Sequence, residues 1–206
     1  VSQLELKKVH NDFELEERLE EFLLYGGYPE VAAEPNPAEK KRLLMELAGS
    51  YLLKDIIELD KVRSSKTILD LLRLLAWQVG NEVSYAEIGQ QIGLNAKTVS
   101  RYLDLLEKAF VIYNLRGYSR NLRQEITKKS KYYFYDNGIR NAIIANFNLL
   151  SLRDDVGKLW ENFLFSERLK KQVYQNISAN NYFWRVWEGG EIDWVEEREG
   201  RIFGYE

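Results

Sequence analysis

The feature that most restricts the fold is a short helix, a glycine turn and a longer helix in the middle of the chain. Ser84, followed three residues later by Glu87, forms a capping-box pattern that predicts the start of the first helix. Gly93 can adopt the left-handed backbone that a tight turn requires, and Asn95 can cap the second helix. Two helices joined in this way predict a helix-turn-helix.

Two strands are predicted directly after these helices. The apolar and aromatic stretches 109–118 and 131–136 each favour a strand. The segment 116–131 that joins them is rich in Lys and Arg, and we count Lys131 among these basic residues. A helix-turn-helix followed by a two-stranded hairpin predicts a winged helix, which we assign to a domain over 50–148.

A winged helix of this kind has a defined way of meeting double-stranded DNA. The early residues of its second helix face the bases, and the wing faces the phosphates. The candidate DNA-binding residues are Lys97, Thr98, Ser100, Arg101, Arg120, Arg123, Lys128 and Lys129. The acids Asp104 and Glu107 follow on the same helix, and the net charge of the chain is −3. A winged helix used as a protein–protein or interdomain module is therefore an equal alternative.

Apolar residues at helical spacing predict further helices on both sides of this unit. The predicted helices are 12–25, 38–59 with a break near Gly49, 64–80, 85–92, 96–109, 136–148 and one from 156. The residues expected to face inward in the last helix are Leu159, Trp160, Phe163 and Leu164. Three strands are predicted after it, at about 181–187, 190–196 and 201–206.

Carboxylates on the terminal strands indicate a second candidate site. Glu191 and Asp193 stand two residues apart in a predicted strand, so both point to the same face. A helix packed over the sheet could bring Glu161 near Asp193 and Glu206, and three converging carboxylates suit Mg²⁺. Such an ion can activate water and neutralise charge on a phosphate. The alternative is a half-exposed sheet whose acids face solvent.

Composition narrows the chemistry that the chain can carry. It has 206 residues, no Cys and one His, which argues against disulfides, thiolate metal sites and a Ser-His-Asp triad. Any catalysis must therefore use carboxylates and lysines. The sequence has no apolar run of 18 or more residues and no visible signal peptide, so we expect a cytoplasmic protein with no membrane partner.

Nearly the whole chain resembles the C-terminal region of a group of bacterial and archaeal AAA-type ATPases. The residues that carry this resemblance are Gly157, Glu161-Asn162, Trp184-Arg185, Glu191-Ile192-Asp193 and Glu206, together with the stretches 22–31 and 84–115. In that group a P-loop ATPase domain precedes a helical lid, a winged helix and a restriction-endonuclease-like domain.

The resemblance implies a division into a lid-like segment over 1–49, the winged helix over 50–148 and a truncated nuclease-like α/β domain over 149–206. The expected fold class is mainly α with an α+β tail. By analogy with the PD-(D/E)xK nuclease pattern, Asp193 and Glu206 would be metal ligands and Glu161 an accessory catalytic acid. The catalytic lysine of that pattern would stand two residues after Glu206, beyond the last residue of this sequence.

These features support three functional hypotheses. The first is a DNA-binding and regulatory module of an AAA-type ATPase, and the second is a Mg²⁺-dependent endonuclease. The third is a protein-interaction module with a degenerate nuclease site. The sequence contains no Gly-x-x-x-x-Gly-Lys-Ser/Thr motif. We therefore do not expect this chain to bind ATP through a P-loop. The resemblance implies ATP binding, ATPase activity and ring-like oligomers for the parent protein, through its N-terminal ATPase domain, which is also the expected partner.

Overall fold

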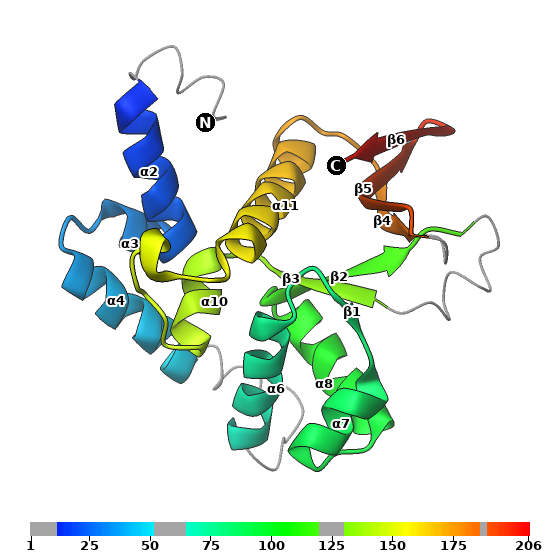
Figure 1. The fold of residues 1–206 in the computed structure, drawn as a ribbon, viewed down its shortest axis with the longest axis horizontal. Coiled ribbons are helices and arrows are strands. Elements are labelled where there is room, and N and C mark those ends of the chain that lie inside the picture. The colour runs from blue at the N-terminus through cyan, green and yellow to red at the C-terminus, as the bar shows by residue number, and fades with distance from the viewer. Residues whose placement is uncertain (1–11, 52–64, 120–129, 186–188) are drawn as a thin grey trace.

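A computed structural model gives the fold and describes residues 12–51, 65–119, 130–185 and 189–206 (Figure 1). The fold is mixed α/β. Its helices are α2 (Asp12–Tyr25), α3 (Pro29–Ala33), α4 (Pro37–Glu46), α6 (Ser65–Trp77), α7 (Tyr85–Ile92), α8 (Ala96–Lys108), α10 (Asn137–Ile143) and α11 (Val156–Tyr174), with a π-helical turn η1 (Leu47–Tyr51) and a 3-10 turn η2 (Leu150–Leu152). Its strands are β1 (Glu82–Val83), β2 (Ile112–Gly117), β3 (Ser130–Phe134), β4 (Asn180–Arg185), β5 (Glu191–Arg198) and β6 (Arg201–Tyr205).

Helices α7 and α8 form as the local sequence predicts. The Ser84 hydroxyl accepts a hydrogen bond from the Glu87 N–H at 3.4 Å, and Gly93 has the left-handed φ of 71°. The Asn95 side chain accepts from the Thr98 N–H at 2.8 Å, which caps α8. The face of α8 turned to the core is formed by Val99, Tyr102, Leu103 and Leu106. These short-range signals were sufficient because each partner lies within three residues.

A mixed sheet of six strands in the described residues has the order β1-β3-β2-β4-β5-β6. Most neighbours are antiparallel, but β2 pairs with β4 in parallel through two registered pairs, Arg116↔Tyr182 and Gly117↔Phe183. This junction was not predicted, because nothing local in either strand specifies a partner so far along the chain. It joins the strands of the predicted winged helix to those of the predicted tail. The division at 148/149 stays a prediction.

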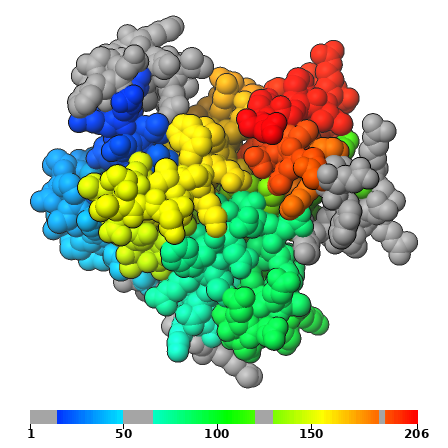
Figure 2. Space-filling model, in the orientation of Figure 1, coloured from blue at the N-terminus to red at the C-terminus, as the bar shows by residue number. Residues whose placement is uncertain are grey.

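The larger of two apolar clusters in the described residues follows this sheet and includes residues from both halves of the chain. It includes Leu44 from α4, Ile88 from α7, Leu103 from α8 and Trp194 from β5, each less than a tenth exposed. In Figure 2 the residues around α10 and α11 (yellow) lie between the N-terminal helices (blue) and β4–β6 (orange and red). Helix α11 therefore contacts both the N-terminal helices and the C-terminal strands.

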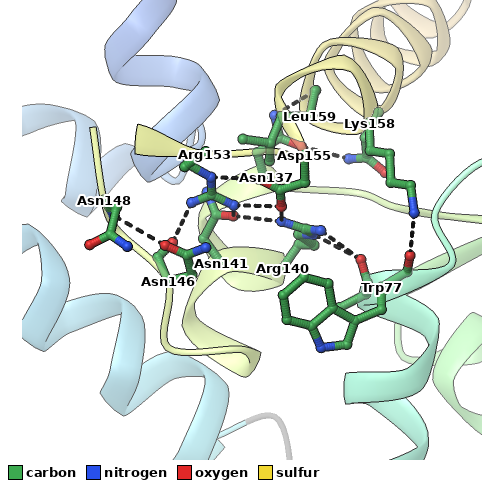
Figure 3. A network of polar contacts seen from close by, with 12 residues as sticks. Trp77, Asn137, Arg140, Asn141, Asn146, Asn148, Arg153, Asp155, Lys158 and Leu159 are labelled. Atoms are coloured by element: carbon green, nitrogen blue, oxygen red, sulfur yellow. Dashed lines mark hydrogen bonds and ion pairs between the residues drawn. The ribbon is translucent and has the colours of Figure 1, made fainter. Parts of the chain in front are cut away.

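A buried polar network, drawn in Figure 3, holds α2, α6, α10 and the start of α11 together. Arg140 on α10 is 1% exposed, donates to the Ala76 carbonyl at 2.7 Å and pairs with Asp155. Arg153 also pairs with Asp155, at 2.7 Å, and donates to Asn141 Oδ1 at 3.0 Å. Asn141 in turn donates to the last-turn carbonyls of α2. The ends of α2 and α6 and the start of α11 are thus connected to α10 through one set of polar side chains.

The predicted inward face of α11 was partly wrong. Leu159 and Phe163 are buried, whereas Trp160 is 40% and Leu164 is 47% exposed. Two polar residues, Asn162 and Ser166, are buried on α11, although an apolar pattern would place both of them on its exposed face. Apolar periodicity misplaced the helix face because the core side of α11 carries hydrogen-bonding groups.

Two other expectations concern the break near Gly49 and the absence of a membrane-spanning helix. The predicted break near Gly49 coincides with the π-helical turn η1, after which residues 52–64 are outside the described part. Among the helices that the structure describes, none combines the length and the apolar character needed to cross a membrane.

Candidate functional site

A cavity of about 260 Å³ brings the three predicted catalytic acids together. It lies between α11 and the last two strands, and its lining includes Glu161 from α11, Asp193 from β5 and Glu206, which follows β6. The rest of the lining is formed by Tyr133, Leu164, Phe165, Arg168, Trp194 and Tyr205. Aromatic and apolar side chains thus line the same cavity as the three acids that the sequence predicted to converge.

Glu161 is placed by the residue that follows it. The Asn162 side chain accepts from the Phe134 N–H at 2.7 Å and donates to the Phe134 carbonyl at 2.9 Å. This two-point contact fixes α11 against the end of β3. Glu161 then lies over β3, where the Tyr133 hydroxyl donates to its Oε1 at 2.7 Å. Asn162 therefore fixes the helix position that places the neighbouring candidate acid, Glu161, over β3.

The surroundings of Glu161 disfavour its charged form. Burial raises the pKa of this carboxyl group, and the negative charges of Asp193 and Glu191 raise it further. The hydrogen bond from Tyr133 and the charge of Lys131 act in the opposite direction. Burial also raises the pKa of the Tyr133 hydroxyl well above its usual range, so the tyrosine remains a hydrogen-bond donor.

Lys131 is the site residue that sequence reasoning missed. Its Nζ lies 2.5 Å from Glu191 Oε1 and 3.3 Å from Asp193 Oδ1, and its side chain is only 3% exposed. The available signal was its spacing of two residues from Tyr133 in β3, which puts both side chains on the face toward the acids. Its position at the end of a basic segment instead grouped it with the cations of the wing.

The arrangement fits a divalent cation poorly. Within the described ranges, no three His, Cys, Asp or Glu side chains lie close enough to hold one metal ion. Asp193 and Glu191 face an ammonium group, and Glu161 accepts from Tyr133. The three predicted acids therefore share a cavity without forming a ready set of metal ligands.

A second ionic group connects α11 to β5 and β6 beside the cavity. Glu196 on β5 is fully buried, and Arg168 on α11 donates to its Oε2 at 2.7 Å and to the Tyr205 hydroxyl at 3.0 Å. Burial works to raise the pKa of Glu196, but hydrogen bonds from Arg168 and Gln172 outweigh it and lower that pKa. Arg168 is thus engaged in holding β5 and β6 to the helix.

The predicted DNA-binding residues fall into two groups. Lys97 and Arg101 are exposed on α8, while Thr98 and Ser100 are partly buried, and the Thr98 hydroxyl donates to Asn95 Oδ1 at 3.0 Å. The Arg101 guanidinium lies 5.3 Å from the centroid of the Tyr102 ring. The wing candidates Arg120, Arg123, Lys128 and Lys129 lie outside the described residues.

Comparison with protein families divides the chain into two matched parts. Residues 16–150 match the model of DUF8612, a domain of unknown function. The chain belongs to the DUF8612 family. Residues 156–206 match the model of DUF4143, also a domain of unknown function, and found in proteins associated with AAA-type ATPases. The expected relation to AAA-type ATPases is supported in this broad form.

The curated relatives are longer than this chain. A protein from Haemophilus influenzae is 27% identical over 97% of the chain and 48% of its own length. Proteins from Methanocaldococcus jannaschii and Mycobacterium tuberculosis are 26% and 27% identical over 88% and 76% of the chain, and the matches cover 40% and 35% of their own lengths. All three are uncharacterized proteins. No solved structure gives a significant match.

Proposed function

We propose that this chain is a DNA-binding and regulatory module that works with an AAA-type ATPase domain, and that α8 is its recognition helix in a winged-helix arrangement. The observation that carries this proposal is the exposed stripe of α8. Lys97, Arg101, Asp104 and Lys108 are all exposed and follow one another at helical spacing. Three of these four side chains are cationic, and the opposite face of the helix is buried.

The start of α8 is well suited to present these cations to a phosphate backbone. The helix N-terminus is capped by Asn95, so its first turn is held in one conformation. Helix N-termini also attract anions through the exposed N–H groups and the helix dipole. Since Thr98 already bonds to Asn95, Lys97 and Arg101 are the side chains that we expect to contact DNA.

A regulatory role is supported by the connection of this helix pair to the rest of the molecule. Tyr85 at the start of α7 and Tyr132 in β3 share a hydrogen bond of 2.7 Å. Strand β3 also holds α11 through Phe134. Forces on the DNA-binding helices would therefore reach the element that packs between the N-terminal helices and the acidic cavity.

The test is duplex DNA binding by the Lys97→Ala/Arg101→Ala variant. We expect its affinity to fall about tenfold or more, with the salt dependence reduced by about two counterions. A matched control is Lys41→Ala/Lys171→Ala, which removes two exposed cations from α4 and α11 and should bind like the unaltered protein. Equal binding by both double variants would favour the interaction-module alternative.

A Mg²⁺-dependent endonuclease is a second candidate, favoured by the presence of Glu161, Asp193 and Glu206 on one cavity. This activity would require Mg²⁺ to displace the Lys131 ammonium from Asp193 and Glu191. If this activity exists, Asp193→Asn should abolish plasmid cleavage in Mg²⁺, because a neutral amide is a poor ligand for a hard cation. Asp154→Asn, at an exposed acid that does not line the cavity, should cleave normally. Unchanged cleavage by Asp193→Asn would exclude the carboxylate mechanism.

A further inference from the structure

We propose that Lys131 neutralises the acidic pair Asp193 and Glu191. Its ammonium group occupies the position between the two carboxylates that a divalent cation would need. The unaltered protein then has low affinity for divalent cations at this site, and removing the lysine charge creates a cation site. This inference does not depend on DNA binding by α8.

The contacts of Lys131 support a fixed position for its charge. The ammonium lies 2.5 Å from Glu191 Oε1 and 3.3 Å from Asp193 Oδ1. The lysine side chain is 3% exposed, whereas the two carboxylate side chains are 35% and 49% exposed. Its Nζ also lies 5.2 Å from the centroid of the Phe183 ring in β4. The cation is therefore the buried partner, and the acids are the ones that solvent reaches.

The surrounding charge explains why a cation is needed there. Glu161, Glu191, Asp193 and Glu206 are all near this part of the sheet. Among the described cations, the other one paired with this group is Arg185, whose Nε is 3.9 Å from Glu191 Oε2. Negative charges on one face of a sheet repel one another, and a positive charge placed between two of them offsets this repulsion. Lys131 supplies that charge from the protein itself.

An ammonium and a metal ion exclude each other at this position. Mg²⁺ and Mn²⁺ require oxygen ligands at about 2.0–2.2 Å, but the facing oxygens of Asp193 and Glu191 already contact Lys131. A divalent ion added beside the ammonium would meet a like charge at short range in a partly desolvated site. The buried Lys131 ammonium therefore competes with a metal ion for these two carboxylates.

The test is direct Mn²⁺ binding, measured by isothermal titration calorimetry and by loss of the free-ion electron paramagnetic resonance signal. Lys131→Met keeps the length and apolar stem of the side chain and removes its charge. We expect this variant to bind Mn²⁺ about tenfold or more tightly than the unaltered protein. Adding Asp193→Asn to Lys131→Met should reverse that gain.

The matched control is Lys40→Met. Lys40 is equally buried, with a side chain 3% exposed, and pairs with Glu21 at 2.8 Å far along the chain from the acids. It should bind Mn²⁺ as the unaltered protein does. Circular dichroism confirms folding of each variant, and Lys131→Gln replaces Lys131→Met if the latter does not fold.

Two results would overturn the proposal. One is equal Mn²⁺ affinity in the unaltered protein and in the folded Lys131 variant, including the absence of binding in both. The other is micromolar Mn²⁺ binding by the unaltered protein that Asp193→Asn removes, a measurement that needs no Lys131 variant.

Discussion

Gly26 illustrates how one residue can carry a contact between distant parts of the chain. It ends α2 with a left-handed φ of 72°, and a Cβ added there would lie 2.0 Å from Asp136 Oδ1. Asp136 accepts hydrogen bonds from the Gly27 N–H at 2.7 Å and from the Ile139 N–H at 3.0 Å. The same carboxylate therefore caps α10 and holds the turn after α2.

Replacing Gly26 with Ala should destabilise the protein strongly. The methyl group adds left-handed backbone strain and displaces the Asp136 cap, which together cost about 3 kcal/mol of unfolding free energy. The control is Gly157→Ala, because a Cβ at Gly157 meets nothing within 4 Å in the first turn of α11. Urea denaturation should show a neutral or slightly stabilised control. A loss below about 1 kcal/mol for Gly26→Ala would contradict the role given to Asp136.

Single residues also mark where sequence reasoning succeeded and where it could not. Ser84, Gly93 and Asn95 were placed correctly because each acts on backbone within a few residues. The positions of Glu161 and Asp193 on one cavity were consistent with strand and helix periodicity. Lys131 was grouped with the basic residues of the wing, whereas its side chain pairs with Glu191 and Asp193. These partners are 60 and 62 residues away, so no local pattern could predict them.

At the scale of elements, α11 shows why burial cannot be read from hydrophobicity alone. Its start at residue 156 was predicted, but its buried face includes Asn162 and Ser166, while Trp160 and Leu164 are exposed. Asn162 is tolerated inside because both of its polar atoms bond to Phe134. A periodicity argument treats an amide as a surface residue and so rotates the helix away from its true packing.

At the scale of the whole molecule, the network in Figure 3 should make stability depend on acid pH. Burial works to raise the pKa of Asp155, but hydrogen bonds from Arg153 and Arg140, with their charges, lower it to about 2. A carboxyl group with a lowered pKa stabilises the fold above its unfolded pKa of about 4, and this contribution disappears as the pH falls through 2. Its size is about 2 kcal/mol.

Asp155→Asn should therefore lose this dependence and leave two buried guanidinium groups without their counter-ion. We expect a loss of about 3–5 kcal/mol of unfolding free energy at pH 7. The difference between the unaltered protein and the variant should shrink between pH 4 and pH 2, as measured by chemical denaturation at each pH. A difference that stays constant over that range would mean that Asp155 does not titrate with the lowered pKa.

The parallel pairing of β2 with β4 through two residue pairs determines which part of the chain can fold as one unit. Residues 16–150 and 156–206 match separate families, yet Gly117 and Phe183 pair across that gap. Two separate family models cover the two ranges, whereas the backbone hydrogen bonds between β2 and β4 make them parts of one sheet. Separating the chain between residues 150 and 156 would leave β2 and β4 each with an unpaired edge. We therefore expect a fragment that ends at residue 150 to aggregate more readily than the whole chain.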